Sequence, residues 1–130
     1  MCQYDLTIVH KFDISGNMES TAIVVAMSAL AQETRLAIFR ALVEAGPDGM
    51  AAGAIAERLA LPPATLSFHV AQLDRAGIVV SRRAGRSILY AAHFPAMQAL
   101  IGALTESCCA GNPEACGFAA SSAKRRRITA

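Results

Sequence analysis

Two segments near the start of the chain, 19–31 and 33–45, carry apolar residues at helical spacing. The first is apolar nearly all round, and a helix without a polar face needs burial on more than one side. That pattern favours a subunit interface along the first helix. The second helix is predicted to stop at Gly46-Pro47-Asp48-Gly49, because a helix does not continue through this tetrapeptide.

Two shorter helices are predicted next, over 52–60 and from Pro63 to about Ala76. Leu61-Pro62 separates them, and a proline suits a first helical turn, where a missing N–H costs nothing. The second of the pair has a clean core stripe at i, i+4 and i+7, formed by Leu66, Val70 and Leu73. Gly77 is the expected C-terminal stop.

After Gly77 the hydrophobic period changes from that of helices to that of strands. Segments 78–83 and 87–92 flank Ala84-Gly85 and predict a β-hairpin with arginines at its tip. A last helix is expected from Pro95 to Ser107, and one more turn of its apolar face, which ends in Leu104, lands on Cys108. The predicted fold is mainly α with a small β-hairpin wing, a winged helix-turn-helix of order α-α-α-α-β-β-α.

The 130 residues fit one small domain with three parts: an N-terminal arm over 1–17, the winged helix-turn-helix domain over 18–110, and a tail over 111–130. With 54% apolar and 5% aromatic residues, the core must be aliphatic. The richest apolar run, Ala22 to Ala31, is too short to span a bilayer, so no membrane partner is expected. The N-terminus lacks the basic head and apolar stretch of a signal peptide. We therefore expect a cytoplasmic protein whose four cysteines are reduced and serve as ligands or reactive groups.

The formal net charge of +2 says little by itself, but the positions of the basic residues are informative. Eight of the twelve lie in two clusters. No Asp or Glu occurs between Asp74 and Glu106. The two clusters are Arg75, Arg82, Arg83 and Arg86, and then Lys124, Arg125, Arg126 and Arg127 at the end of the chain. Such asymmetry suits a phosphate backbone, although a basic run can also be a solvated surface.

Two short helices joined by a tight turn can place the second helix in the major groove of DNA. Five polar side chains lie off its core stripe and could read base edges or phosphate, namely Thr65, Ser67, His69, Gln72 and Arg75. The hairpin supplies Arg82, Arg83 and Arg86 to the neighbouring groove or backbone. The alternative is an exposed face that serves solubility, and for His69 a structural histidine bonded to a neighbouring helix.

The chain resembles the ArsR/SmtB family of metal-responsive winged-helix repressors over roughly Met18 to Cys116. The runs that carry the resemblance are ETRLAIFRALVEAG, IAERLALPPATLSFHVAQLDRAGIV and SRRAGRSILYAA. The family implies a homodimer that pairs its first and last helices and binds a two-fold operator in double-stranded DNA. Its members usually repress efflux or detoxification genes and release DNA when an ion binds. Pro62 is a departure, because a small polar cap is common at that position.

Three cysteines near the C-terminus form the candidate ion site. Cys108 and Cys109 are adjacent, and Cys116 follows Gly111-Asn112-Pro113, which can turn the chain back toward them. Trivalent arsenic or antimony takes three thiolates in a pyramid, whereas zinc generally wants four ligands in a tetrahedron. No obvious fourth ligand is present, so arsenite, or antimonite, is the expected inducer. Cys2 stands alone in the arm and is expected to have no role.

Two other ion sites that the resemblance suggests are absent: a Cys-x-Cys in the helix before the turn, and an Asp-His pair on the last helix. What remains is similar to arsenite repressors with a vicinal pair and a third cysteine after the last helix. We expect a repressor of an arsenic-resistance operon without an organic cofactor. The same fold could instead sense zinc or cadmium, methylated arsenicals, or oxidants. A thiol enzyme or a metal carrier is disfavoured because no Gly-rich anion loop precedes any cysteine.

Overall fold

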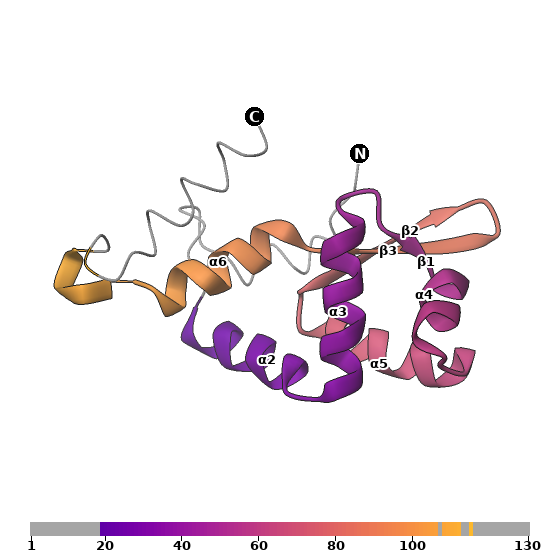
Figure 1. Ribbon diagram of the computed structural model, residues 1–130, viewed down its shortest axis with the longest axis horizontal. Coiled ribbons are helices and arrows are strands. Elements are labelled where there is room, and N and C mark those ends of the chain that lie inside the picture. Colours follow the sequence, from indigo (N-terminus) through magenta and orange to yellow (C-terminus); the bar gives the residue numbers. More distant parts are fainter. Residues whose placement is uncertain (1–18, 107, 113–114, 116–130) are drawn as a thin grey trace.

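The computed structural model describes residues 19–106, 108–112 and 115 (Figure 1). In chain order the elements are α2 (Ser20–Leu30), α3 (Glu33–Ala45), β1 (Met50–Ala51), α4 (Ala52–Leu59), α5 (Pro63–Arg75), β2 (Val79–Ala84), β3 (Ser87–Ala92), α6 (Phe94–Leu104) and the 3₁₀ turn η1 (Cys108–Gly111). The predicted arm over 1–17, Cys2, Cys116 and the basic end of the chain lie outside the described residues.

The winged helix-turn-helix fold is confirmed, with one strand more than the sequence predicted. The antiparallel sheet has the order β1-β3-β2, and β2 and β3 pair from Val79↔Ala92 to Ala84↔Ser87. The additional strand, β1, pairs Met50 with Tyr90. A strand of two residues is too short to show an alternating hydrophobic pattern. The strand conformation of β1 depends on its pairing with β3, so the local sequence does not predict it.

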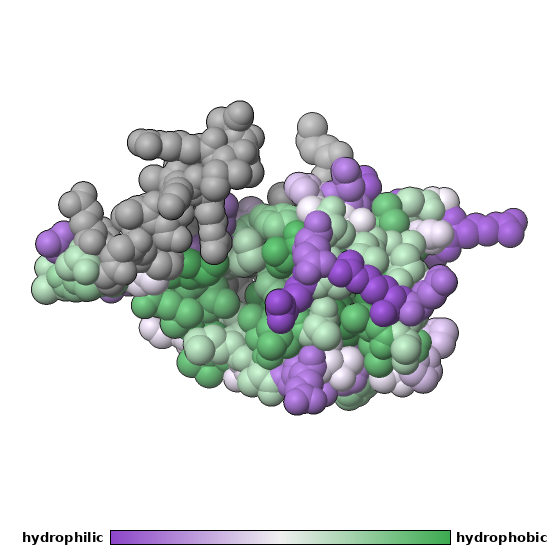
Figure 2. Space-filling view, in the orientation of Figure 1, coloured by the Kyte–Doolittle hydropathy of each residue, from purple (hydrophilic) through white to green (hydrophobic). Residues whose placement is uncertain are grey.

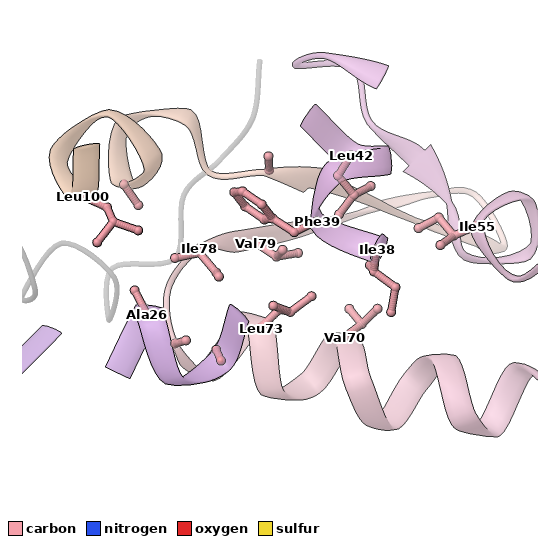
Figure 3. Close-up of a cluster of buried hydrophobic side chains, with 14 of the residues drawn as sticks. Ala26, Ile38, Phe39, Leu42, Ile55, Val70, Leu73, Ile78, Val79 and Leu100 are labelled. Carbon is pink, nitrogen blue, oxygen red and sulfur yellow. The ribbon is translucent and has the colours of Figure 1, made fainter. Parts of the chain in front are cut away.

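The core is aliphatic, as the composition required, and lies between α3, α5 and the base of the hairpin. Figure 3 shows Ile38 and Leu42 of α3 facing Val70 and Leu73 of α5, with Val79 between them. All five side chains are essentially inaccessible to solvent. Each contributes about 1.5–3 kcal/mol through burial, so this cluster fixes α5 firmly against the body of the domain.

Helix α2 packs against α6 at one end of the molecule (Figure 1). Its inward stripe consists of Ala22, Ala26 and Ala29, small residues that let the helices approach closely. Among the described residues no single helix is long and apolar enough to span a membrane. Helices α2 and α3 reach that length only together, and they are bent by 102° at their junction.

Two residues with positive φ shape the turns around the helix-turn-helix. Ala60 ends α4 in the left-handed conformation (φ 53°), and the next amide, of Leu61, donates a 2.9 Å hydrogen bond to the carbonyl of Ala56. Gly49 (φ +76°) lies so close to β3 that a Cβ there would be 2.3 Å from the carbonyl oxygen of Tyr90. Only glycine therefore fits where the loop after α3 meets the sheet.

The end of the last helix differs from the prediction. We expected the helix to reach Ser107 and its apolar stripe to continue onto Cys108, but α6 ends at Leu104. The described residues beyond it are polar or small and mostly exposed, so a continued helix there would bury no apolar face. Cys108 instead begins a separate turn, in which Cys109 and Ala110 have left-handed backbones (φ 54° and 56°). A right-handed helix cannot continue through them.

Candidate functional site

Helix α5 presents one face to the core and the opposite face outward. Its core stripe, Leu66, Val70 and Leu73, is at most 2% exposed. Of the five polar side chains predicted to contact DNA, Thr65, Ser67 and Arg75 are exposed, and His69 and Gln72 are half-buried at the flanks. The structure therefore brings all five onto the sides of α5 that the core stripe leaves open.

His69 is one of the two half-buried side chains among these five. Its Nδ1 is buried and has no hydrogen-bond partner within the described residues. Its ring and that of Phe68 form a T-shaped pair, with ring centroids 5.5 Å apart. Within the described residues, His69 therefore does not hydrogen-bond a neighbouring helix through Nδ1, as the alternative interpretation of this residue required.

The wing is a tight hairpin with arginines along one strand and at its tip. Gly85 and Arg86 form the two-residue loop, and Gly85 has a positive φ (62°). Glycine at the first loop position is typical of a type II′ turn, which matches the twist of the strands. Arg82 approaches the carbonyl of Asp48 at 3.5 Å, whereas Arg83 and Arg86 are exposed and make no hydrogen bond or ion pair with described residues. These two guanidinium groups are available to phosphate.

A groove of about 370 Å³ runs beside the C-terminal end of α5. Gln72 and Arg75 line it together with Arg35 of α3, and residues of α2 form its other wall. The Nε of Arg35 donates a 2.6 Å hydrogen bond to the carbonyl of Ala29, which holds this side chain in place. Nothing in the sequence groups Arg35 with α5, since their proximity depends on the packing of α3 against α5.

The vicinal cysteines form a compact pair of thiols on the turn after α6. Their Sγ atoms are 3.6 Å apart, with Cys109 exposed and Cys108 half-buried. Two thiolates bound to one tetrahedral ion through bonds of about 2.3 Å would be about 3.8 Å apart, so the pair can share one ion with little rearrangement. Among the described residues no group of three metal-ligating side chains occurs. Cys116, the predicted third ligand, lies outside them.

His93 serves the fold. It is 4% exposed, its Nδ1 accepts a 3.2 Å hydrogen bond from the Ala96 amide, and its own amide donates to the carbonyl of Ile78 at 2.8 Å. Burial lowers the pKa of His93 below its usual value of 6.5. A neutral imidazole capping α6 inside the domain does not add a ligand to the cysteine pair.

Phe68 is a residue of α5 that the sequence prediction left out. Its side chain is 61% exposed, in the middle of a helix whose other large apolar residues are buried. Its spacing from Leu66 places it away from the core stripe, and this spacing is the feature of the sequence that identifies Phe68 as outward-facing.

Comparison with known proteins identifies the family. A helix-turn-helix domain profile matches residues 30–82, from the end of α2 into β2. The transcriptional activator HlyU of Vibrio cholerae is 31% identical over 93 residues, covering 72% of this chain and 83% of HlyU. A solved structure of HlyU superposes with a TM-score of 0.54 and 32% identity, covering 65% of this chain and 92% of that one. The chain belongs to the ArsR family of winged helix-turn-helix transcriptional regulators.

Other similar proteins agree with this placement. The nodulation protein NolR of Rhizobium meliloti is 34% identical over 80 residues, which are 62% of this chain and 63% of NolR. The winged helix-turn-helix DNA-binding domain of Mb0332 from Mycobacterium bovis, described as homodimeric and as a possible ArsR-family regulator, has a TM-score of 0.54 and 26% identity. That match covers 67% of this chain and 81% of Mb0332. As an ArsR-family member, the chain is a DNA-binding transcriptional regulator rather than an enzyme.

Proposed function

We propose that this ArsR-family regulator is a homodimeric, cytoplasmic repressor of an arsenic-resistance operon. Trivalent arsenic, or antimony, would release it from its operator by taking the thiolates of Cys108, Cys109 and Cys116. The observation that carries the proposal is the 3.6 Å spacing of the Cys108 and Cys109 sulfur atoms on an accessible turn. Cys116 follows seven positions after Cys109 in the sequence and would complete a three-thiolate pyramid.

DNA binding is assigned to α5 and the wing. Ser67, Thr65 and Gln72 can hydrogen-bond base edges in the major groove, and Arg75 suits guanine or phosphate. His69 flanks this face, and Nε2, the ring nitrogen other than the buried Nδ1, could add a hydrogen bond to the DNA. Arg83 and Arg86 at the wing tip, with Arg82 on the strand, supply positive charge to the adjacent backbone.

The dimer is assigned to the outward faces of α2 and α6. Hydrophobic surface gathers over these two helices in Figure 2. Val24 of α2 is 62% exposed and Leu104 of α6 is 58% exposed, which is unusual for large apolar side chains grouped on adjoining elements. A second copy of the chain would cover this surface and set the spacing of the two α5 helices.

The turn η1, which carries Cys108 and Cys109, is hydrogen-bonded to the end of α6. Ion binding at this turn could therefore change the spacing of the two α5 helices in the proposed dimer. The amide of Cys108 donates a 3.0 Å hydrogen bond to the carbonyl of Thr105, the residue that caps α6. Drawing Cys116 toward the vicinal pair would pull on this connection and on the adjoining outward face of α6. A coupling of about 1–3 kcal/mol changes operator affinity about 5–150-fold, which suffices for induction.

The test is fluorescence anisotropy of the reduced protein on the DNA upstream of its own coding sequence. Arsenite is titrated into the complex and, separately, zinc and cadmium. We expect arsenite to lower the affinity at least about tenfold, and Cys108→Ser, Cys109→Ser and Cys116→Ser each to abolish that release. Cys2→Ser is the matched control and should respond like the natural chain. Full arsenite release in Cys116→Ser would rule out the three-thiolate site.

A second candidate inducer is a ligand that needs two thiols only, and the vicinal spacing favours it specifically. A methylated trivalent arsenical takes two thiolates, and an oxidant acts on two thiols. With such an inducer, release would persist in Cys116→Ser and disappear in Cys108→Ser. The same set of variants therefore separates a three-thiolate repressor from a two-thiol one.

A further inference from the structure

The outward face of α5 carries an aromatic ring that no role described so far uses. Phe68 is 61% exposed and touches His69 edge-on, with an interplanar angle of 72°. Leaving such a ring in water forgoes much of the stabilisation that burial of an apolar side chain provides. The ring packs outside the core, so the fold itself gains little from it.

The position of Phe68 on the helix points it away from the protein. Successive residues of an α-helix are rotated by about 100°, which places Phe68 about 200° around the axis from Leu66 and Arg75 about 180° from it. Phe68 and Arg75 therefore share the face directly opposite the core stripe. The neighbours of Phe68 at i−4 and i+3 on this face are Ala64 and Ala71, so the ring protrudes between two small side chains.

We propose that Phe68 contacts the 5-methyl group of a thymine in the major groove of the operator, and thereby selects a T·A pair there. The inference rests on α5 entering the major groove, as proposed above. The thymine methyl is the apolar group that base pairs display in that groove, and phenylalanine is suited to contact it. The ring offers no hydrogen bond, so the polar edges of the other bases would lose water against it without compensation.

The surrounding charge favours DNA as the occupant of this face over an apolar protein surface. Arg75 shares the outward face with Phe68, and Gln72 flanks it. An apolar partner would bury the Arg75 guanidinium, whereas phosphate or guanine pairs with it. The edge-on contact with His69 limits the orientations of the ring, so less conformational entropy is lost when it meets the base.

The experiment replaces thymine with deoxyuridine, which removes only the methyl group. The probe is a duplex selected from random sequences by the full-length reduced protein, with each thymine replaced in turn. For the natural chain we expect one symmetry-related thymine pair to matter, with a loss of about fourfold in affinity for one half-site and about fifteenfold for both. Phe68→Ala should bind the all-thymine duplex more weakly and show no further loss at that pair.

Ser67→Ala is the matched neighbour. It removes an adjacent polar side chain, so its affinity can fall, but it should retain the loss at the deoxyuridine position. The inference is overturned if no thymine replacement weakens the natural chain, or if Phe68→Ala shows the same loss as the natural chain. Unchanged thermal unfolding of Phe68→Ala excludes misfolding. Failure of the natural chain to bind any duplex would instead contradict the proposed function, so the two failures are distinguishable.

Discussion

Burial of His93 couples the stability of the domain to pH. The imidazole caps α6 through the Ala96 amide, and burial lowers its pKa below 6.5. The unfolded chain therefore binds a proton more readily than the folded chain. The free energy of unfolding is fully maintained above about pH 6.5 and declines as the pH falls through that value toward the lower pKa of the folded state.

Replacing His93 with asparagine should flatten this decline. Asparagine keeps an oxygen that accepts from the Ala96 amide but does not titrate. We expect the loss of stability between pH 7.5 and 5.0, measured by urea unfolding at fixed protein concentration, to be smaller in His93→Asn than in the natural chain. The other two histidines are common to both proteins and cancel in the comparison. Equal slopes in the two proteins would show that His93 is not the coupled group.

The left-handed Ala60 offers a second test at a single position. A side chain in this conformation costs about 1–2 kcal/mol, and glycine there loses about 0.5–1 kcal/mol through chain entropy. Ala60→Gly should therefore raise the free energy of unfolding by about 0.5–1 kcal/mol. Ala54→Gly, at an exposed position inside α4, is the control and should lower it by about 0.5–1 kcal/mol. Destabilisation by both substitutions, measured by chemical unfolding, would contradict the strain at Ala60.

The apolar outer faces of α2 and α6 give a prediction that concerns whole helices. Leu104→Lys places a charge in the proposed dimer surface, where burying it without a partner is costly. We expect the variant to sediment as a monomer at micromolar concentration and to bind operator DNA at least about tenfold more weakly. Ala54→Lys on α4, at the opposite end of the molecule in Figure 1, should remain dimeric. A natural chain that is itself monomeric would refute the interface.

The elements of this fold were predictable where a hydrophobic pattern spans two or more turns. The predicted helix over 33–45 matches α3, and the predicted helix from Pro63 ends within about one residue of α5, because apolar spacing and local stop signals coincide there. β1 was missed because its conformation depends on β3, which lies forty residues away in the sequence. The end of α6 was misplaced because a periodic position at Cys108 does not ensure that anything packs there.

Across the whole molecule, charge is distributed so that a net value of +2 understates the attraction to DNA. Each arginine that neutralises a phosphate steepens the dependence of log affinity on log salt by about 0.9. We expect Arg86→Ala to reduce that slope by about one for each protomer's contact and to weaken specific and random duplexes alike. Arg58 is already paired with Glu44, so Arg58→Ala is the control and should leave the slope nearly unchanged.

Only part of the candidate site could be predicted from the sequence. The polar positions of α5 follow from its core stripe, and the wing arginines follow from the hairpin. Arg35 lies beside Gln72 and Arg75 because α3 packs against α5, a tertiary feature without a local signature. Hydrophobicity alone assigns Phe68 to the core, as it does most apolar residues of a helix, and only its angle around the helix axis places it outside.

The turn that carries Cys108 and Cys109 lies apart from the buried core, whose last member among the described residues is Leu100. Substitutions in this turn should therefore cost the fold little, while they would alter the thiols proposed to bind the inducer. If the inducer binds this turn, as proposed above, the inducer site and the DNA-binding helix α5 occupy separate parts of the structure and can evolve independently. A lineage could exchange the ion to which it responds by a few changes after Leu104 and still recognise the same operator.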